Sequence, residues 1–272
     1  MKNHILYTLQ LADNALIYGH RLGEWCGHGP VLEQDIALTN ISLDYIGQSR
    51  SFYQHAANLF NELPEAEKLE LFQSVALEEK IKKAEKLDEY DFAYLRDGWD
   101  YRNIMLTEQP NGDWAVTVAR AFFFDVFQAL YYTQLLKSKD LQLAAIAEKS
   151  LKEVSYHKRW SAEWVIRLGD GTEESHAKMQ EAIDNLWSFT GEMFTMTDEE
   201  KAMADTGIAM DTTLLRSKWM EEVTAIMDEA TLKMPENNWM HDGGKNGRHS
   251  EHLGYILAEL QFMQRAYPGM EW

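Results

Sequence analysis

The 272-residue chain has little of several residues that often mark secreted or multidomain proteins. Its single cysteine, Cys26, cannot form an internal disulfide, which favours a reducing compartment, and we expect the cytoplasm. Only five prolines are present, and no stretch rich in glycine, serine or proline divides the chain. We therefore expect one domain over residues 1–272.

Long apolar runs and basic residues are also scarce. No run approaches the ~18 apolar residues of a membrane span, and Thr8, Gln10 and Asp13 interrupt the first segment, so we expect no signal peptide. There are 26 basic against 44 acidic residues, giving a net charge of −18. Nucleic acids and anionic membranes bind basic surfaces, so we expect neither as a partner.

What the chain has is helical periodicity, with almost no strand alternation. The apolar pattern predicts helices over about 4–22, 32–60, 114–137, 140–168, 173–194, 211–232 and 250–267. The helix at 114–137 is apolar on nearly all sides and should be central. Between about 61 and 90 the charges alternate in sign, which predicts a solvated helical excursion. The predicted fold is all-α, a ferritin-like four-helix bundle with additional peripheral helices.

Each of the four predicted core helices carries one carboxylate in an apolar stretch. These carboxylates are Asp13, Asp44, Asp125 and Glu153. A ferritin-like bundle holds two iron or manganese ions with one inward carboxylate per helix and Glu-x-x-His on two helices. Here the third residue after Asp44 is Gly47, and the third after Glu153 is Tyr156. The pattern thus indicates vestigial ligand positions without their histidines, and we expect no metal or other cofactor on this chain.

Two features leave the interpretation of these carboxylates open. His157 lies four residues after Glu153 on the same helix face, and one alternative is a residual metal half-site formed by these two residues. Alternatively, cations near the helix ends could neutralise the acids in place of metal. The candidate cations are Arg21, Arg50, Arg120 and Arg159. Asp125 lies between phenylalanines, and its burial demands a hydrogen-bonding or charged partner.

The tail segment at residues 243–254, GGKNGRHSEHLG, is a second candidate site. Lys245, Arg248 and His249 make a small basic spot on an acidic protein, and glycine-rich backbone before a helix can bind an anion or an anionic cofactor. The alternative, which we favour, is a loop that enters the last helix with Ser250 as its N-cap.

Several segments resemble those of a known family, the structural C subunits of bacterial ring-1,2-phenylacetyl-CoA epoxidases. The similar segments span nearly the whole chain in order and include RLGEWCGH at 21–28, DYIGQ at 44–48, EQPNG at 108–112, GGKNGRHSEHLG at 243–254, and Pro268-Gly269 with Trp272. The resemblance is weakest at about 61–90.

The resemblance implies a non-catalytic subunit that shares its fold with a di-iron catalytic A subunit and stabilises it. Iron and the substrate thioester would lie in the A subunit. Other small subunits and a flavin and iron–sulfur reductase would complete the complex, and self-association remains open.

Two other functions stay as rivals. One is an independent di-metal oxygenase that uses the four carboxylates and His157. The other is a helical binding module that contacts an acyl-CoA through Lys245 and Arg248.

Overall fold

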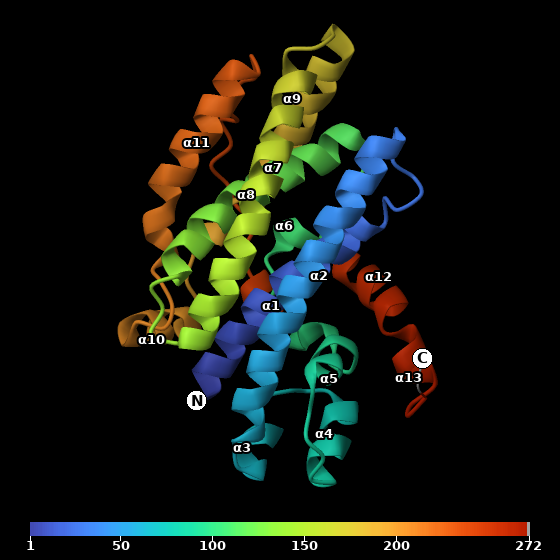
Figure 1. Ribbon diagram of the computed structural model, residues 1–272, viewed down its shortest axis with the longest axis vertical. Helices are drawn as coiled ribbons and strands as arrows, with labels where there is room; N and C mark the ends of the chain where they lie inside the picture. The colour runs from blue at the N-terminus through green and yellow to red at the C-terminus, as the bar shows by residue number, and fades with distance from the viewer. Residues whose placement is uncertain (271–272) are drawn as a thin grey trace.

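Four long helices form the centre of the molecule (Figure 1). The computed structural model describes residues 1–270, so Trp272 lies outside the described residues. The four are α1 (Lys2–Gly23), α2 (Leu32–Asn61), α7 (Trp114–Leu135) and α8 (Leu141–Gly169). Helix α1 packs along α2, α7 packs along α8, and α2 meets α8 across the bundle. No strand occurs within residues 1–270, and the predicted all-α, ferritin-like bundle is confirmed.

The boundaries of the second helix pair follow from local capping. Asp113 accepts a hydrogen bond from the backbone N–H of Val116 at 3.1 Å and begins α7, as the sequence predicts. Asp140 likewise accepts from the backbone N–H groups of Gln142 and Leu143 and begins α8. These caps satisfy amide groups that have no partner inside the helix.

Helix α7 is the central helix. Phe122, Phe123 and Phe124 are all inaccessible to solvent, although they point in different directions around the axis. Helices α8, α9 (Glu173–Trp187) and α11 (Arg216–Glu229) pack around it. An all-round apolar helix needs such enclosure, and this prediction is confirmed.

The charged stretch at 61–90 is not one helix but a series of short ones. It contains α3 (Glu65–Leu69) and α4 (Val75–Lys82), and α5 (Glu89–Tyr94) begins at its end. Leu77 and Ile81 are buried, so one face of the stretch packs against the bundle while the charges stay outside. A short 3₁₀ turn, η1 (Gly98–Asp100), and α6 (Met105–Glu108) lead back to α7.

The second half of the chain supplies the peripheral helices, and here the predicted boundaries were partly wrong. The helix predicted to reach 194 ends at Trp187, and a 3₁₀ turn, η2 (Gly191–Phe194), follows. Helix α10 (Asp198–Thr206) was missed although Thr197 and Glu200 form its capping box. The remaining elements are η3 (Thr212–Leu215), η4 (Gly244–Asn246), α12 (Glu251–Leu260) and α13 (Phe262–Ala266).

A lipid bilayer could not be crossed by any helix in the described part of the chain, because none combines the necessary length with the necessary apolar character.

Candidate functional site

The four carboxylates of the core helices do not lie at the same depth. Asp13 and Asp125 are buried, whereas Asp44 and Glu153 are partly exposed, with 40% of the Asp44 side chain accessible. The expectation of one inward carboxylate on each helix therefore holds for α1 and α7 and is wrong for α2 and α8.

Asp125 lies at the middle of α7 and accepts a hydrogen bond from the hydroxyl of Tyr45 on α2 at 2.7 Å. Burial raises the pKa of this carboxyl to about 6, although the charge of His157 and the bond from Tyr45 oppose the rise. The ring of Tyr45 packs edge-on against Tyr18 of α1. The predicted hydrogen bonding of Asp125 is thus present, and its donors include the neutral phenol of Tyr45 and the hydroxyl of Ser161.

Asp13 is neutralised by a cation that the sequence did not single out. Both of its oxygens face the guanidinium of Arg96, and the pair is completely inaccessible to solvent. The hydroxyl of Tyr53 also donates to Asp13, at 2.5 Å, and the backbone N–H of Arg102 donates to it at 2.8 Å. The carboxylate therefore receives ionic and neutral donors from three segments, which compensates for its desolvation.

The four arginines proposed as neutralising cations lie elsewhere. Arg21 pairs with Glu24 and Arg50 with Glu89. The guanidinium of Arg120 is buried against the backbone oxygen of Gln109 and the side chain of Asn111, and that of Arg159 stacks over Tyr156. Among the described residues, none of these four arginines forms an ion pair with Asp13, Asp44, Asp125 or Glu153, and that expectation is corrected.

The interior positions of α2 and α8 lie one residue later than the sequence pattern suggested. On α2 the buried neighbours of Asp44 and Gly47 are Tyr45 and Gln48, and on α8 the buried neighbours of Glu153 and Tyr156 are Val154 and His157. Successive helical residues differ by about 100° around the axis, so an offset of one residue turns a side chain from the core toward the surface.

Gly47 and Tyr156, the positions expected to lack histidines, therefore do not face the interior. Tyr156 is 45% exposed. Gly47 and Glu153 line a cleft of about 340 Å³ between α2 and α8, and a Cβ atom at Gly47 would meet nothing within 4 Å. Histidines at 47 and 156 would lie outside the bundle interior.

Hydrogen bonds link the interior pairs to the partly exposed acids. The Nε2 of His157 lies 2.9 Å from Asp44, and the amide of Gln48 donates to Glu153 at 2.9 Å. Tyr132 of α7 donates to the amide oxygen of Gln48 at 3.1 Å. The half-site suggested for Glu153 and His157 is thus divided, because each of the two residues pairs with α2 instead.

This donor set does not fit two metal ions. A di-iron bundle presents about four carboxylates and two imidazoles inward, whereas Tyr45, Gln48 and Val154 occupy three of the four inward positions of the α2 and α8 pairs. A phenol with a raised pKa, an amide and an aliphatic side chain are poor substitutes for carboxylate and imidazole. The polar side chains of the interior form hydrogen bonds that connect α2, α7 and α8. They do not provide the ligands of a di-metal site.

The tail segment binds an anion, but that anion belongs to the chain itself. The backbone N–H groups of Gly243 and Lys245 each donate to the carboxylate of Glu192 at 3.0 Å. The ammonium of Lys245 is buried and donates to Glu200 at 3.0 Å. The glycine-rich backbone thus does what its chemistry allows, with an internal ligand.

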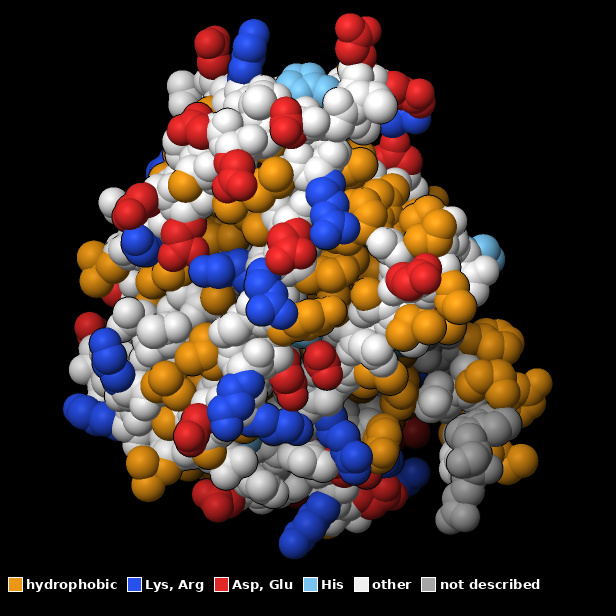
Figure 2. Space-filling view, turned by 45° about the horizontal axis from the view of Figure 1, so that its top comes forward, with side chains coloured by type: hydrophobic (Ala, Val, Ile, Leu, Met, Phe, Trp, Pro, Cys, Tyr) orange, Lys and Arg blue, Asp and Glu red, His pale blue; other side chains and the backbone are white. Residues whose placement is uncertain are grey.

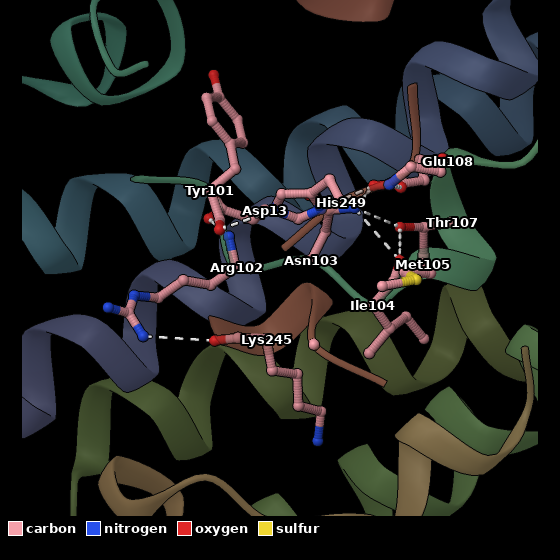
Figure 3. Close-up of polar contacts among 12 residues, drawn as sticks. Asp13, Tyr101, Arg102, Asn103, Ile104, Met105, Thr107, Glu108, Lys245 and His249 are labelled. Atoms are coloured by element: carbon pink, nitrogen blue, oxygen red, sulfur yellow. Dashed lines mark hydrogen bonds and ion pairs between the residues drawn. The ribbon is translucent and has the colours of Figure 1, made fainter. Parts of the chain in front are cut away.

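His249 is also satisfied internally. Its Nδ1 lies 2.8 Å from Glu108 and its Nε2 lies 3.0 Å from the backbone oxygen of Tyr101, so the imidazole joins α6 to the segment before it (Figure 3). Burial lowers the pKa of His249, but the bonds and charge of Glu108 outweigh it and leave the pKa raised. Of the proposed anion-binding residues only Arg248 is exposed, so an anion or coenzyme A contact at Lys245 and His249 is not supported.

Comparison with known proteins places these observations in a family. The model of a family described as phenylacetic acid catabolic protein matches residues 1–272. The chain is 45% identical over 266 residues to the C subunit of the 1,2-phenylacetyl-CoA epoxidase of Escherichia coli (strain K12), and the match covers 98% of each chain.

Proposed function

Because the chain belongs to the phenylacetic acid catabolic protein family, we propose that it is the C subunit of a 1,2-phenylacetyl-CoA epoxidase in aerobic phenylacetate catabolism. In this role it is non-catalytic and stabilises a di-iron A subunit that carries out the oxygenation. The observation that carries the proposal is the 45% identity over 98% of both chains to the C subunit of the Escherichia coli epoxidase.

The interior of the bundle supports a non-catalytic role. Oxygen activation by a ferritin-like protein needs the paired metal ions that bind O₂, and this chain offers Tyr45, Gln48 and Val154 at the corresponding inward positions. What remains of the polar interior, Asp125 with Tyr45 and His157 with Asp44, forms internal hydrogen bonds. We therefore assign the iron to the partner A subunit.

The surface supports association with other subunits. Leu32, Ile36 and Leu43 on the first half of α2 are more than half exposed, and so are Tyr255 and Phe262 near the end of the chain. Figure 2 shows hydrophobic side chains gathered beside the last described residues. Exposed apolar groups of this size favour protein contacts. The expected partners are the A subunit, the other small subunits and a flavin and iron–sulfur reductase, all in the cytoplasm.

The experiment that tests the role compares three preparations. Epoxide formation from phenylacetyl-CoA, with NADPH and reductase, is measured for this chain alone, for the A subunit alone and for the pair. We expect one of two results. Either only the pair forms epoxide, or the pair forms epoxide at a far higher rate than the A subunit alone. Turnover by this chain alone at the rate of the pair would overturn the proposal and favour an independent oxygenase.

A second experiment is co-purification of the native protein from cell extract, with identification of the proteins that accompany it. Companions that do not include an A subunit would also count against the proposed function.

A further inference from the structure

A cluster of two histidines and one aspartate lies at the end of the bundle, away from the interior described above. His4 is in the first turn of α1, His55 is near the end of α2, and Asp140 caps α8. The Nε2 atoms of His4 and His55 lie 2.8 Å and 2.7 Å from the same oxygen, Oδ2 of Asp140. Within residues 1–270 this is the only group of three or more histidine, cysteine, aspartate or glutamate side chains with ligand atoms close enough to share a metal ion.

We propose that His4, His55 and Asp140 bind one zinc ion, which fastens α1 and α2 to the start of α8. Two imidazoles and one carboxylate form a known zinc ligand set that leaves a fourth position for water. Ligand atoms around tetrahedral zinc lie about 3.3 Å apart when the bonds are about 2.0–2.1 Å. The Nε2 atoms of His4 and His55 lie 2.8 Å and 2.7 Å from Oδ2 of Asp140, so each of these two spacings must widen by about half an ångström to admit an ion.

The carboxylate is oriented for this task by the helix that it caps. Its other oxygen, Oδ1, accepts the backbone N–H groups of Gln142 and Leu143 at 2.8 Å and 3.0 Å. Oδ2 is thereby directed at the two imidazoles. Such hydrogen bonds to the outer atoms of a ligand fix its position and strengthen metal binding.

The nitrogen of His4 supplies a second, independent observation. This buried Nε2 atom contacts Oδ2 of Asp140 at 2.8 Å, and no hydrogen bond to any other group is found for it among the described residues. Coordination to a cation between the two atoms would satisfy both the nitrogen lone pair and the carboxylate. The side chains of His4, His55 and Asp140 are only 14%, 11% and 10% exposed, which is sufficient shielding for a stable site.

The cleft of about 340 Å³ between α2 and α8 reaches one of the three residues, because His55 and Gln142 form part of its lining. Under the proposal, the ion would enter from the side of His55. In Figure 1 the start of α1, the later part of α2 and the start of α8 lie toward the same end of the bundle. The ion would join the α1–α2 pair to the α7–α8 pair, which gives it a stabilising role.

The test uses the tag-free, full-length protein after chelator treatment. Equilibrium dialysis against Zn²⁺ alone, with elemental analysis, should give one zinc per chain, and Mg²⁺ should not compete, because the nitrogen ligands disfavour it. Co²⁺ should give the visible absorption of a tetrahedral site. Saturating zinc should raise the Tm by roughly 5 °C at about 100-fold excess over Kd.

The variants H55Q and D140N decide whether these residues are the ligands. Asparagine still caps a helix, so D140N should fold while it loses zinc affinity by more than about 100-fold, beyond the usual effect of an outer-shell partner. The control is H28Q, since His28 is exposed near the exposed Cys26 and could bind zinc adventitiously. Loss of zinc in H28Q alone, unchanged binding in both H55Q and D140N, or no saturable binding at all would overturn the proposal.

Discussion

Arg96 and Asp13 form an ion pair that excludes solvent completely, although the two residues lie 83 positions apart in the sequence. Arg96 Nη1 donates to one carboxylate oxygen of Asp13 at 3.0 Å, and Nη2 contacts the other. The pair joins the middle of α1 to the segment between α5 and η1. That segment has little regular structure of its own, so the pair fixes its position.

Removal of either partner should therefore destabilise the protein strongly. D13N or R96M leaves a buried charge or dipole without its partner, and each should lower the free energy of unfolding by about 3–5 kcal/mol. The double variant D13L/R96M should recover part of this loss. Urea unfolding measures all three. R50M is the matched control, because Arg50 is 60% exposed and its pair with Glu89 should contribute less than about 1 kcal/mol.

Asp125 should make the protein less stable as pH rises. Its pKa is about 6 in the folded state and about 3.9 in an unfolded chain, so between these values the folded state holds the extra proton. The contribution of Asp125 to the free energy of unfolding is fully present below about pH 4. It is lost as the pH rises through 6, which lowers the free energy of unfolding by roughly 3 kcal/mol.

The variant D125N should remove this dependence and be at least as stable as wild type at pH 7, because asparagine accepts the same bond from Tyr45. Urea unfolding at pH 4, 5, 6 and 7 measures it, with E163Q on the exposed face of α8 as control. A loss of several kcal/mol at pH 7 would instead indicate a buried cation as the partner of Asp125.

The bundle interior should hold no stoichiometric iron or manganese. Elemental analysis of protein expressed with excess iron measures this, and about two ions per chain would contradict it. A sharper form uses the double variant G47H/Y156H, which completes both carboxylate-x-x-His spacings. It should still lack iron, since residue 156 faces solvent and position 47 faces the cleft. Iron in the double variant would mean that our assignment of the inward positions is wrong.

Under the proposed function, substitutions in the polar interior should not abolish epoxidation while the complex stays intact. Y45F removes the hydroxyl that bonds Asp125 and should leave the turnover of the assembled complex within about twofold of wild type, or below about 0.4 kcal/mol in activation free energy. Product formation and size-exclusion chromatography are measured together. A large loss of turnover in an intact complex would show that this interior takes part in the chemistry.

Much of the fold followed from the sequence because its signals were local. Asp113 and Asp140 mark the starts of α7 and α8, and the run around Phe123 identifies the central helix. The inward phase of α2 was not readable, because α2 carries polar and apolar residues on more than one face. Arg96 was missed for a different reason: its pairing depends on where an irregular segment crosses α1, and no periodicity records that.

The tail was also misread for a physical reason. A glycine-rich segment with Lys245 has the same composition whether it binds an external anion or Glu192 of its own chain. A signal was present in EQPNG, since Glu108 is a buried acid that needs a partner, and His249 provides it. Only the packed structure shows which acid meets which base.

The solvent-free pair of Asp13 and Arg96 also limits how this protein can change in evolution. A neutral residue at either position alone passes through a chain with an unpaired buried charge, so a lineage must change both residues almost together or neither. Relatives should therefore carry the aspartate and the arginine jointly, or replace both with apolar residues. The two positions should therefore co-vary among relatives, although they lie on separate segments of the chain.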